Sequence, residues 1–297
     1  MRILITGITG YIGSNLARAL LPAHEVYGLV RAPLNGTYLG EVRERLRLLY
    51  YDGSYESVSA ALTASRPELV YHMAAYYTGA HGPDDTPALI ESNITLGAYL
   101  LEALSVHGGS ALVYASTVMA HYQGADYRPL NLYAATKRAF SDLLDYYTDA
   151  GLLRAVTLVL SDTYGPGDNR PKILNLIQSA IQNKAHISLT SGTQDYDAVY
   201  IDDIVRAFLL AGKHALQSDV GKNEIYQVCA QNPLTLRETI DLLLEVNHLR
   251  LSAGWGERTQ PKREIHRAVR IYPLLPGWEE RIPLAEGLKR LWNETVC

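Results

Sequence analysis

Three evenly spaced glycines follow a short apolar segment at the start of the chain. Ile3-Leu4-Ile5 has the composition of a buried strand, and Gly7, Gly10 and Gly13 come directly after it. Glycines between a strand and a helix permit a tight turn, let the backbone approach a pyrophosphate and let the helix pack on the strand. The first turn of that helix presents unpaired N–H groups to an anion. A structural turn is the alternative, but the position after an apolar strand favours a dinucleotide-binding unit.

Short apolar segments alternate with longer amphipathic segments over the first 160 residues. Strands that are apolar throughout are typical of a parallel sheet covered by helices on both faces. The pattern predicts an α/β fold with a doubly wound, Rossmann-type parallel sheet. We expect strands at 3–5, 26–30, 47–51, 69–72, 111–114 and 155–160, and helices at 14–21, 57–64, 92–106 and 133–148.

Beyond Leu160 the segments become shorter and the loops richer in Gly, Pro, Asp and Asn. A helix is expected at 173–183, and 199–210 begins as a strand and continues as a helix. The predicted dinucleotide-binding domain is therefore 1–163 with about 195–213. A smaller C-terminal α/β substrate domain would consist of 164–194 and 214–297.

Composition excludes several classes of protein. The chain has 297 residues with 27 Lys and Arg against 31 Asp and Glu, so its net charge of −4 argues against nucleic-acid binding. Cys229 and Cys297 are too few for a disulfide framework or a cysteine-rich zinc site, and we expect no metal. No apolar run approaches the roughly 18 residues of a membrane span, and the N-terminus lacks a signal-peptide layout. A cytoplasmic protein without a membrane partner is the expectation.

The residue at the end of the second expected strand should distinguish NAD from NADP. An acidic residue there would bond the ribose 2′-hydroxyl, whereas an arginine would accept a 2′-phosphate. This strand ends in Arg31, and no acid follows before Glu41. An exposed arginine without a ligand is the alternative, but the sequence favours NADP(H) over NAD(H).

Tyr133 and Lys137 lie four residues apart, so they share a face of the expected helix. With 21 tyrosines in the chain such a pair arises easily by chance, and it could be a surface pair. Its position gives it weight, because the preceding strand carries Ser116 and Thr117 at its carboxyl end. Ligands of parallel sheets bind at the carboxyl ends of the strands. These side chains are therefore expected at the same pocket as the glycine loop.

The three side chains Thr117, Tyr133 and Lys137 make a chemical unit. A phenol has a pKa of about 10, and a nearby ammonium favours its anion. Tyr133 could then exchange a proton with a substrate oxygen near neutral pH, while Thr117 bonds the same oxygen. A nicotinamide cofactor would supply the hydride.

At this point the sequence resembles the extended short-chain dehydrogenase/reductase family of NAD(P)-dependent sugar-nucleotide epimerases, dehydratases and reductases, over nearly its whole length. The matching motifs are Thr6 to Gly13, Asp52, His72 to Ala75, Asn93, Ser116-Thr117, Tyr133 to Lys137, Tyr164 to Asp168, Val199 to Asp203, Pro276 to Trp278 and Leu284 to Leu288. The resemblance implies that Tyr133 is the catalytic acid/base, that Lys137 lowers its pKa and holds the nicotinamide ribose, and that Thr117 is the family's hydroxyl.

The resemblance also implies a set of cofactor contacts and a dimer. The expected cofactor-binding residues are Gly7, Thr9, Gly10, Tyr11, Ile12, Gly13, Arg31, Asp52, Gly53, Met73, Ala74, Ala75, Asn93, Ala115, Tyr133 and Lys137. Members commonly dimerise through the two helices that here begin near Ser92 and Tyr133, which form a four-helix bundle.

Departures from the family pattern narrow the chemistry. The acids that carry out elimination in the 4,6-dehydratases are replaced by Val118 and Met119, which cannot move a proton. The arginine that usually contacts the substrate diphosphate is Tyr196 here. The expected substrate-binding residues are Thr117, Thr163, Arg170, Lys172 and Arg281; surface charge is the alternative for the three cations.

The run Asp162 to Lys172 is most similar to the branch containing CDP-paratose and CDP-abequose synthases, which are NADPH-dependent 4-keto reductases. The leading hypothesis is thus an NADPH-dependent reductase of a 4-keto (deoxy)sugar nucleotide. A sugar-nucleotide epimerase that retains its cofactor is the alternative, and a non-catalytic NADP-binding regulator is a further one. We interpret His72 and His121 as packing or hydrogen-bonding residues. The basic segment 261–270 is interpreted as a mobile, solvated loop, with contact to a substrate phosphate as the alternative.

Overall fold

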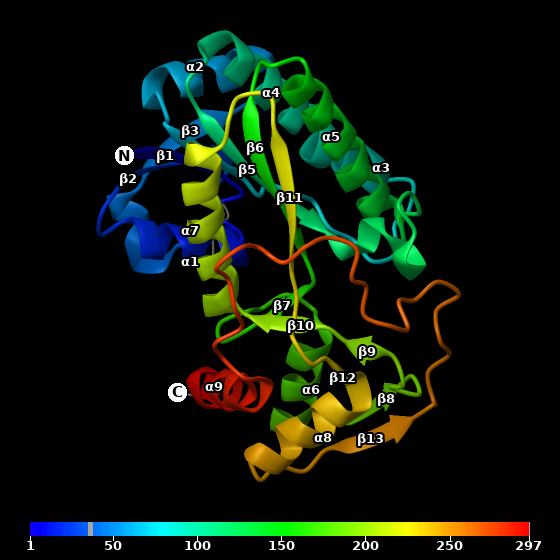
Figure 1. The fold of residues 1–297 in the computed structure, drawn as a ribbon. Coiled ribbons are helices and arrows are strands. Elements are labelled where there is room, and N and C mark those ends of the chain that lie inside the picture. The colour runs from blue at the N-terminus through cyan, green and yellow to red at the C-terminus, as the bar shows by residue number, and fades with distance from the viewer. Residues whose placement is uncertain (35–37, 297) are drawn as a thin grey trace.

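A seven-stranded parallel sheet forms the centre of the computed structural model, which describes residues 1–34 and 38–296 (Figure 1). Its strands are β1 (Arg2–Thr6), β2 (Glu25–Arg31), β3 (Arg47–Tyr51), β4 (Leu69–His72), β5 (Ala111–Thr117), β6 (Arg154–Leu160) and β11 (Asn223–Val228). Their order is β11-β6-β5-β4-β1-β2-β3, and every neighbouring pair is parallel. The predicted fold class and its first six strands are confirmed.

Helices cover both faces of this sheet. On one face lie α1 (Tyr11–Leu20) and α7 (Ile201–Gln217), and on the other lie α2 (Tyr55–Ser65), α4 (Leu96–His107) and α5 (Leu132–Asp149). Because side chains alternate along a strand, Ile3 and Ile5 join the core beneath α1 and α7, whereas Leu4 joins the core beneath the other three helices. A sheet buried on both faces explains why its strands are apolar throughout.

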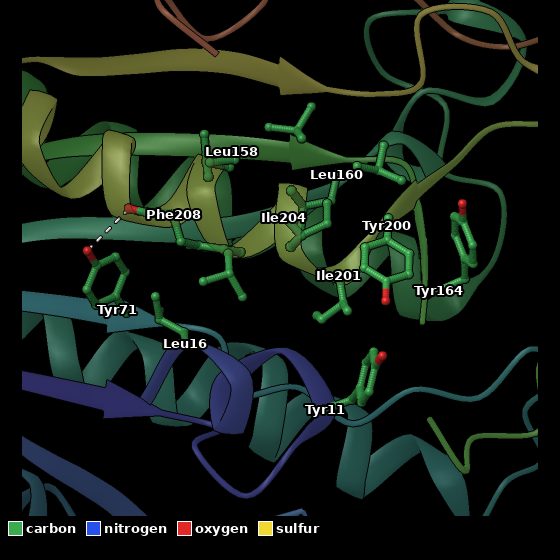
Figure 2. Packing of buried hydrophobic residues seen from close by; sticks show 14 of the residues in the cluster. Tyr11, Leu16, Tyr71, Leu158, Leu160, Tyr164, Tyr200, Ile201, Ile204 and Phe208 are labelled. Atoms are coloured by element: carbon green, nitrogen blue, oxygen red, sulfur yellow. Dashed lines mark hydrogen bonds between the residues drawn. The ribbon is translucent and has the colours of Figure 1, made fainter. Parts of the chain in front are cut away.

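Tyr71 of β4 fixes α7 on the sheet. Its ring meets that of Phe208 edge to face at 6.1 Å, and its hydroxyl donates to the Phe208 carbonyl at 3.2 Å (Figure 2). Figure 2 follows the same apolar cluster past Ile204 and Ile201 to Tyr200 and Tyr164, where the sheet domain meets the smaller one. One continuous core therefore joins the two parts.

The smaller domain consists of short sheets and three helices at the carboxyl end of the main sheet (Figure 1). Its strand pairs are β7 (Asp162–Tyr164) with β10 (Ala198–Tyr200), β8 (His186–Leu189) with β13 (Ser252–Trp255), and β9 (Asp195–Tyr196) with β12 (Leu234–Thr235). Its helices are α6 (Ile173–Gln182), α8 (Leu236–Val246) and α9 (Leu284–Val296). The remaining helical segments are η1 (Gly40–Arg45), α3 (Asp85–Ile90), η2 (Glu91–Thr95), η3 (Val118–Ala120) and η4 (Tyr122–Gly124).

Two segments depart from the predicted domain boundaries. Strand β11, expected within the substrate domain, pairs with β6 as the last strand of the main sheet. Its sequence Asn-Glu-Ile-Tyr-Gln-Val is half polar because it lies at an edge, so its composition does not resemble that of the central strands. Strand β10 pairs with β7 outside the main sheet, and only the helix that follows it packs on the central strands. Cys297 lies outside the described residues.

Candidate active site

The glycine loop closes tightly against the loop that follows β4. Gly7 has a φ of +71°, and a Cβ atom there would come within 2.6 Å of the Ala74 nitrogen. Gly10 is the N-cap of α1 and supplies no side-chain acceptor, and the first turn carries no acidic residue. The N–H groups of this turn are therefore left to an anion, which is the environment that a pyrophosphate requires.

Thr6 joins this loop to β4. Its Oγ1 accepts hydrogen bonds from the Met73 and Ala74 nitrogens at 3.2 and 3.1 Å and lies 2.8 Å from Nδ1 of His72. Burial, with Lys137 nearby, lowers the pKa of His72 to about 3. His72 is therefore a neutral packing residue, in agreement with its interpretation from sequence.

Arg31 and Asp52 end β2 and β3 at the edge of the sheet where the glycine loop lies. Arg31 is exposed, with Nη1 3.4 Å from the Ser92 hydroxyl. Asp52 accepts from the nitrogen and hydroxyl of Ser54 at 2.9 and 2.6 Å, and these bonds lower its pKa. Asp52 thus organises the turn into α2, and its cofactor contact, like that of Gly53 beside it, stays a prediction.

Asn131 caps α5 and so positions its first turn. Its side chain accepts from the Ala134 nitrogen at 2.9 Å. Tyr133 is half-buried in this turn, and Lys137, one turn later, is 2% exposed. Helix α5 packs on β5 and on η3, which begins directly after Thr117. The helix-borne pair and the strand-end hydroxyl therefore come from elements in direct contact.

The pKa shifts of Tyr133 and Lys137 differ from those expected from the sequence. Burial, with Tyr77 next in importance, raises the pKa of Tyr133, and the cation that opposes this rise is Arg170. Burial also lowers the pKa of Lys137 to about 7. Lys137 was expected to lower the phenol pKa, but desolvation is the largest contribution for both groups and sets the direction of both shifts. The protein's own groups thus keep Tyr133 protonated, as a proton donor requires.

Thr117 has a hydroxyl proton to offer. Its Oγ1 accepts from the Met119 nitrogen at 3.2 Å, and its side chain is buried at 8% exposure. An oxygen held by this bond can donate its proton to a substrate oxygen. Val118 and Met119 follow it in η3, so the two positions after the hydroxyl carry no proton-transfer group.

Asn93 has an architectural role, and its predicted cofactor contact stays a prediction. It is 1% exposed; its oxygen accepts from the Tyr76 nitrogen, and its amide donates to the Tyr76 carbonyl and the Thr136 hydroxyl. Thr136 in turn donates to the Tyr133 carbonyl at 2.8 Å. All of these groups belong to the protein, so Asn93 fastens the loop after β4 to the start of α5.

The three cations expected to hold the substrate are each paired. Arg170 forms a two-pronged pair with Asp168, at 2.7 and 2.6 Å, and lies over the Tyr11 ring. Lys172 pairs with Asp162 and donates to the carbonyl of Thr163, which is itself buried, at 3.1 Å. Arg281 pairs with Glu279 at 3.1 Å on the surface. Their contact with a substrate stays a prediction.

Two further residues border Tyr133 and its neighbours. The Tyr77 ring meets that of Tyr133 edge to face at 4.9 Å, although Tyr77 is 55% exposed. Burial opposes ionisation of Asp162, but Lys172 lowers its pKa, and Asp162 acts electrostatically on both Tyr77 and Tyr196. Sequence reasoning gave neither a role, although both follow strands at the carboxyl edge of the sheet, which was the available signal.

The segment 261–270 is anchored at several points, while most of its residues are exposed, in agreement with the interpretation as a solvated loop. Arg263 donates to the Pro129 and Leu130 carbonyls and lies over the Tyr122 ring. Arg267 and Arg270 pair with Asp195 and Asp197 of the β9 region. With the turn at 123–124, residues 265–271 line a pocket of about 430 Å³. The ion pairs of Arg267 and Arg270 could not be predicted from local sequence, because Asp195 and Asp197 are some 70 residues away.

Comparison with known proteins agrees with this geometry. The model of the NAD dependent epimerase/dehydratase family matches residues 3–229. CDP-abequose synthase of Yersinia pseudotuberculosis is 30% identical over 261 residues, which cover 86% of this chain and 88% of that protein. UDP-glucose 4-epimerase of Mycolicibacterium smegmatis is 23% identical, covering 98% of this chain and 97% of the other.

Solved structures match over nearly the whole chain. UDP-glucose 4-epimerase of Thermus thermophilus in complex with NAD superposes with a TM-score of 0.81 at 26% identity, covering 99% of this chain and 98% of that one. UDP-glucuronic acid 4-epimerase of Bacillus cereus reaches 0.84 at 20% identity, with the same coverage, and supports the fold alone. Across residues 1–34 and 38–296, no helix is both long and apolar enough to cross a membrane.

Proposed function

Because this chain belongs to the NAD dependent epimerase/dehydratase family, and so to the oxidoreductases of the extended short-chain dehydrogenase/reductase type, we propose that it is an NADPH-dependent reductase of a 4-keto (deoxy)sugar nucleotide. The observation that carries the proposal is the placement of Tyr133 in the first turn of α5, with Lys137 one turn later, against η3, which follows Thr117 and has no acid at 118 or 119. A ketone reductase needs one proton donor and no second acid–base pair.

The chain's own residues divide the work of such a reduction. A bound nicotinamide cofactor supplies the hydride. Tyr133 donates its phenolic proton to the C4 oxygen as charge develops there, and Thr117 donates a hydrogen bond to the same oxygen. Lys137, behind the phenol on the same helix face, offers an ammonium to the nicotinamide ribose and to the phenolate left after proton transfer.

The glycine loop fits a dinucleotide, and Arg31 supports NADPH. The uncapped first turn of α1 is suited to the pyrophosphate. Arg31 is exposed at the carboxyl end of β2, and Asp52, which follows the neighbouring strand β3, is engaged by Ser54. A guanidinium without a competing carboxylate would pair with a 2′-phosphate.

The relatives support the substrate class. Of the two curated relatives named above, CDP-abequose synthase has a higher identity to this chain than UDP-glucose 4-epimerase. The Asp162 to Lys172 run is also similar to the branch that contains CDP-abequose synthases. The epimerases among the relatives and solved structures favour a second candidate, an epimerase that oxidises and re-reduces one carbon. Such an enzyme would keep its cofactor through purification and consume no net NADPH.

Assays with a panel of 4-keto-6-deoxy sugar nucleotides test the proposal. NADPH and NADH are each followed at 340 nm. We expect oxidation of NADPH with at least one substrate, and a 10²- to 10⁴-fold loss of activity in Tyr133→Phe. Tyr50→Phe is the matched control, since Tyr50 is exposed on β3. No oxidation of either cofactor, or full activity in Tyr133→Phe, would exclude the reductase.

We further propose a homodimer through a four-helix bundle of α4 and α5. Exposed apolar side chains on these helices, Val106 at 68% and Tyr146 at 64%, support this surface. Light scattering on the purified protein should give twice the mass of one chain, and Tyr146→Glu should shift it toward the monomer. A single-chain mass for the unmodified protein at micromolar concentration would contradict the proposal.

A further inference from the structure

The Lys137 ammonium lies against an aromatic face. Its Nζ is 4.4 Å from the centroid of the Tyr114 ring, and the two residues are 2% and 0% exposed. In the described part of the chain, no acceptor forms a hydrogen bond with this Nζ. The ring is therefore the protein group that most directly faces the charge.

The Tyr114 ring is held from three sides. Its hydroxyl donates to the Lys137 carbonyl at 2.9 Å, which ties β5 to α5. Phe140 packs on it with ring centroids 4.6 Å apart, and His72 stacks at 5.8 Å with an interplanar angle of 21°. Gly97 of α4 leaves the room that Phe140 fills, since a Cβ there would clash with the ring. Tyr114, Phe140, His72 and Gly97 together form what we call the aromatic box around Lys137. The Tyr114 ring cannot turn away from Lys137 without displacing Phe140 or His72.

The other titratable groups near Lys137 do not compensate its charge. His72, from β4, is neutral. Tyr133, on α5 itself, is protonated by burial, and so is Tyr114. With no carboxylate among these neighbours, burial lowers the pKa of the ammonium to about 7. The electron-rich face of Tyr114 is the one feature of the box that favours the cation.

We propose that Tyr114 is a positioning residue whose ring face holds Lys137 in its charged form, one helical turn after Tyr133 on α5. The inference rests on the proposed function only in giving Lys137 a role in the reaction. A desolvated cation over an aromatic face is stabilised relative to the neutral amine, and this stabilisation raises the pKa of the cation. Loss of the ring should therefore lower the midpoint of Lys137 titration by about one pH unit.

Two substitutions separate the ring face from the hydroxyl. Tyr114→Phe keeps the face and loses the bond to the Lys137 carbonyl, whereas Tyr114→Leu loses both. The lysine 13Cε and 15Nζ signals are titrated by NMR, and Lys137→Met identifies the Lys137 signal among the chain's seven lysines. We expect the Leu variant to titrate about one pH unit lower and the Phe variant to stay within about 0.3 unit of wild type.

An unchanged midpoint in Tyr114→Leu, or equal shifts in the Phe and Leu variants, would overturn the inference. Circular dichroism establishes that each variant is folded, and Tyr114→Met, which also lacks a ring face, takes the place of a Leu variant that does not fold. In the active enzyme, the alkaline limb of kcat/KM should move down with the Lys137 midpoint. The NMR result does not depend on turnover, so an enzyme inactive on every sugar nucleotide would contradict the proposed function and leave this inference standing.

Discussion

The Thr6 hydroxyl lies 2.8 Å from Nδ1 of His72, and the Thr6 side chain is fully buried. This contact joins the end of β1 to the end of β4, the two strands between which the sheet reverses its winding. Dinucleotides bind at such a reversal. The same hydroxyl accepts the Met73 and Ala74 N–H groups, so one buried oxygen fixes both loops that border the expected cofactor.

Thr6→Val should therefore destabilise the fold and weaken cofactor binding together. Valine matches threonine in shape but leaves the Ala74 N–H and His72 Nδ1 without this partner, at a cost of about 1 to 3 kcal/mol in the free energy of unfolding. Urea unfolding measures that loss, and calorimetry with NADPH measures affinity. Thr63→Val, on the exposed face of α2, is the control. Equal stability of the two variants would contradict the role given to Thr6.

Arg31→Asp tests the cofactor preference. The carboxylate would repel a 2′-phosphate and bond a 2′-hydroxyl, so we expect kcat/KM with NADPH to fall about 10- to 100-fold relative to NADH. Arg250→Asp makes the same charge change at an exposed position after α8 and should leave the ratio unchanged. A ratio that moves equally in both variants would point to net charge rather than to a 2′-phosphate contact.

Lys137 should make stability depend on pH. Its native pKa of about 7 lies below the ordinary lysine value, so between these values the unfolded chain binds a proton that the native chain does not. The free energy of unfolding should therefore rise with pH above 7, by about 1 kcal/mol per pH unit from this group. Lys137→Met should lack this rise, and its advantage over wild type should be greatest below pH 7. Parallel curves for the two proteins from pH 6 to 9 would show that Lys137 titrates normally.

Much of the fold could be predicted because its central strands are buried on both faces. An uninterrupted apolar run such as Val26–Val30 or Ala155–Leu160 leaves little choice but a parallel strand beneath helices. Strand β11 escaped prediction because an edge position tolerates its Asn, Glu and Gln. Tyr133, Lys137 and Thr117 could be found from their place after a strand, since topology brings strand ends together.

The partners of these residues could not be predicted, because they are distant in sequence. Tyr114 and Lys137 meet only through the packing of β5 on α5, and no local pattern marks a ring that faces a cation. Arg170 differs in that its partner Asp168 is only two residues away, and its contact with a substrate stays a prediction. The partners of Asn93, Tyr76 and Thr136 of α5, are likewise 17 and 43 residues away, and its cofactor contact stays a prediction.

Gly97 provides a last test of the box around Lys137. Replacing a helical glycine by alanine ordinarily stabilises a helix by about 1 kcal/mol. In α4 the added methyl would strike the Phe140 ring, which packs on both Tyr114 and His72. We therefore expect Gly97→Ala to lower the free energy of unfolding by about 1 to 3 kcal/mol. Gly97→Ala combined with Phe140→Leu should recover part of the loss, because the smaller side chain yields the space. A Gly97→Ala protein more stable than wild type would mean that the Phe140 ring is free to move. The inference that Phe140 holds the Tyr114 ring in place would then be wrong.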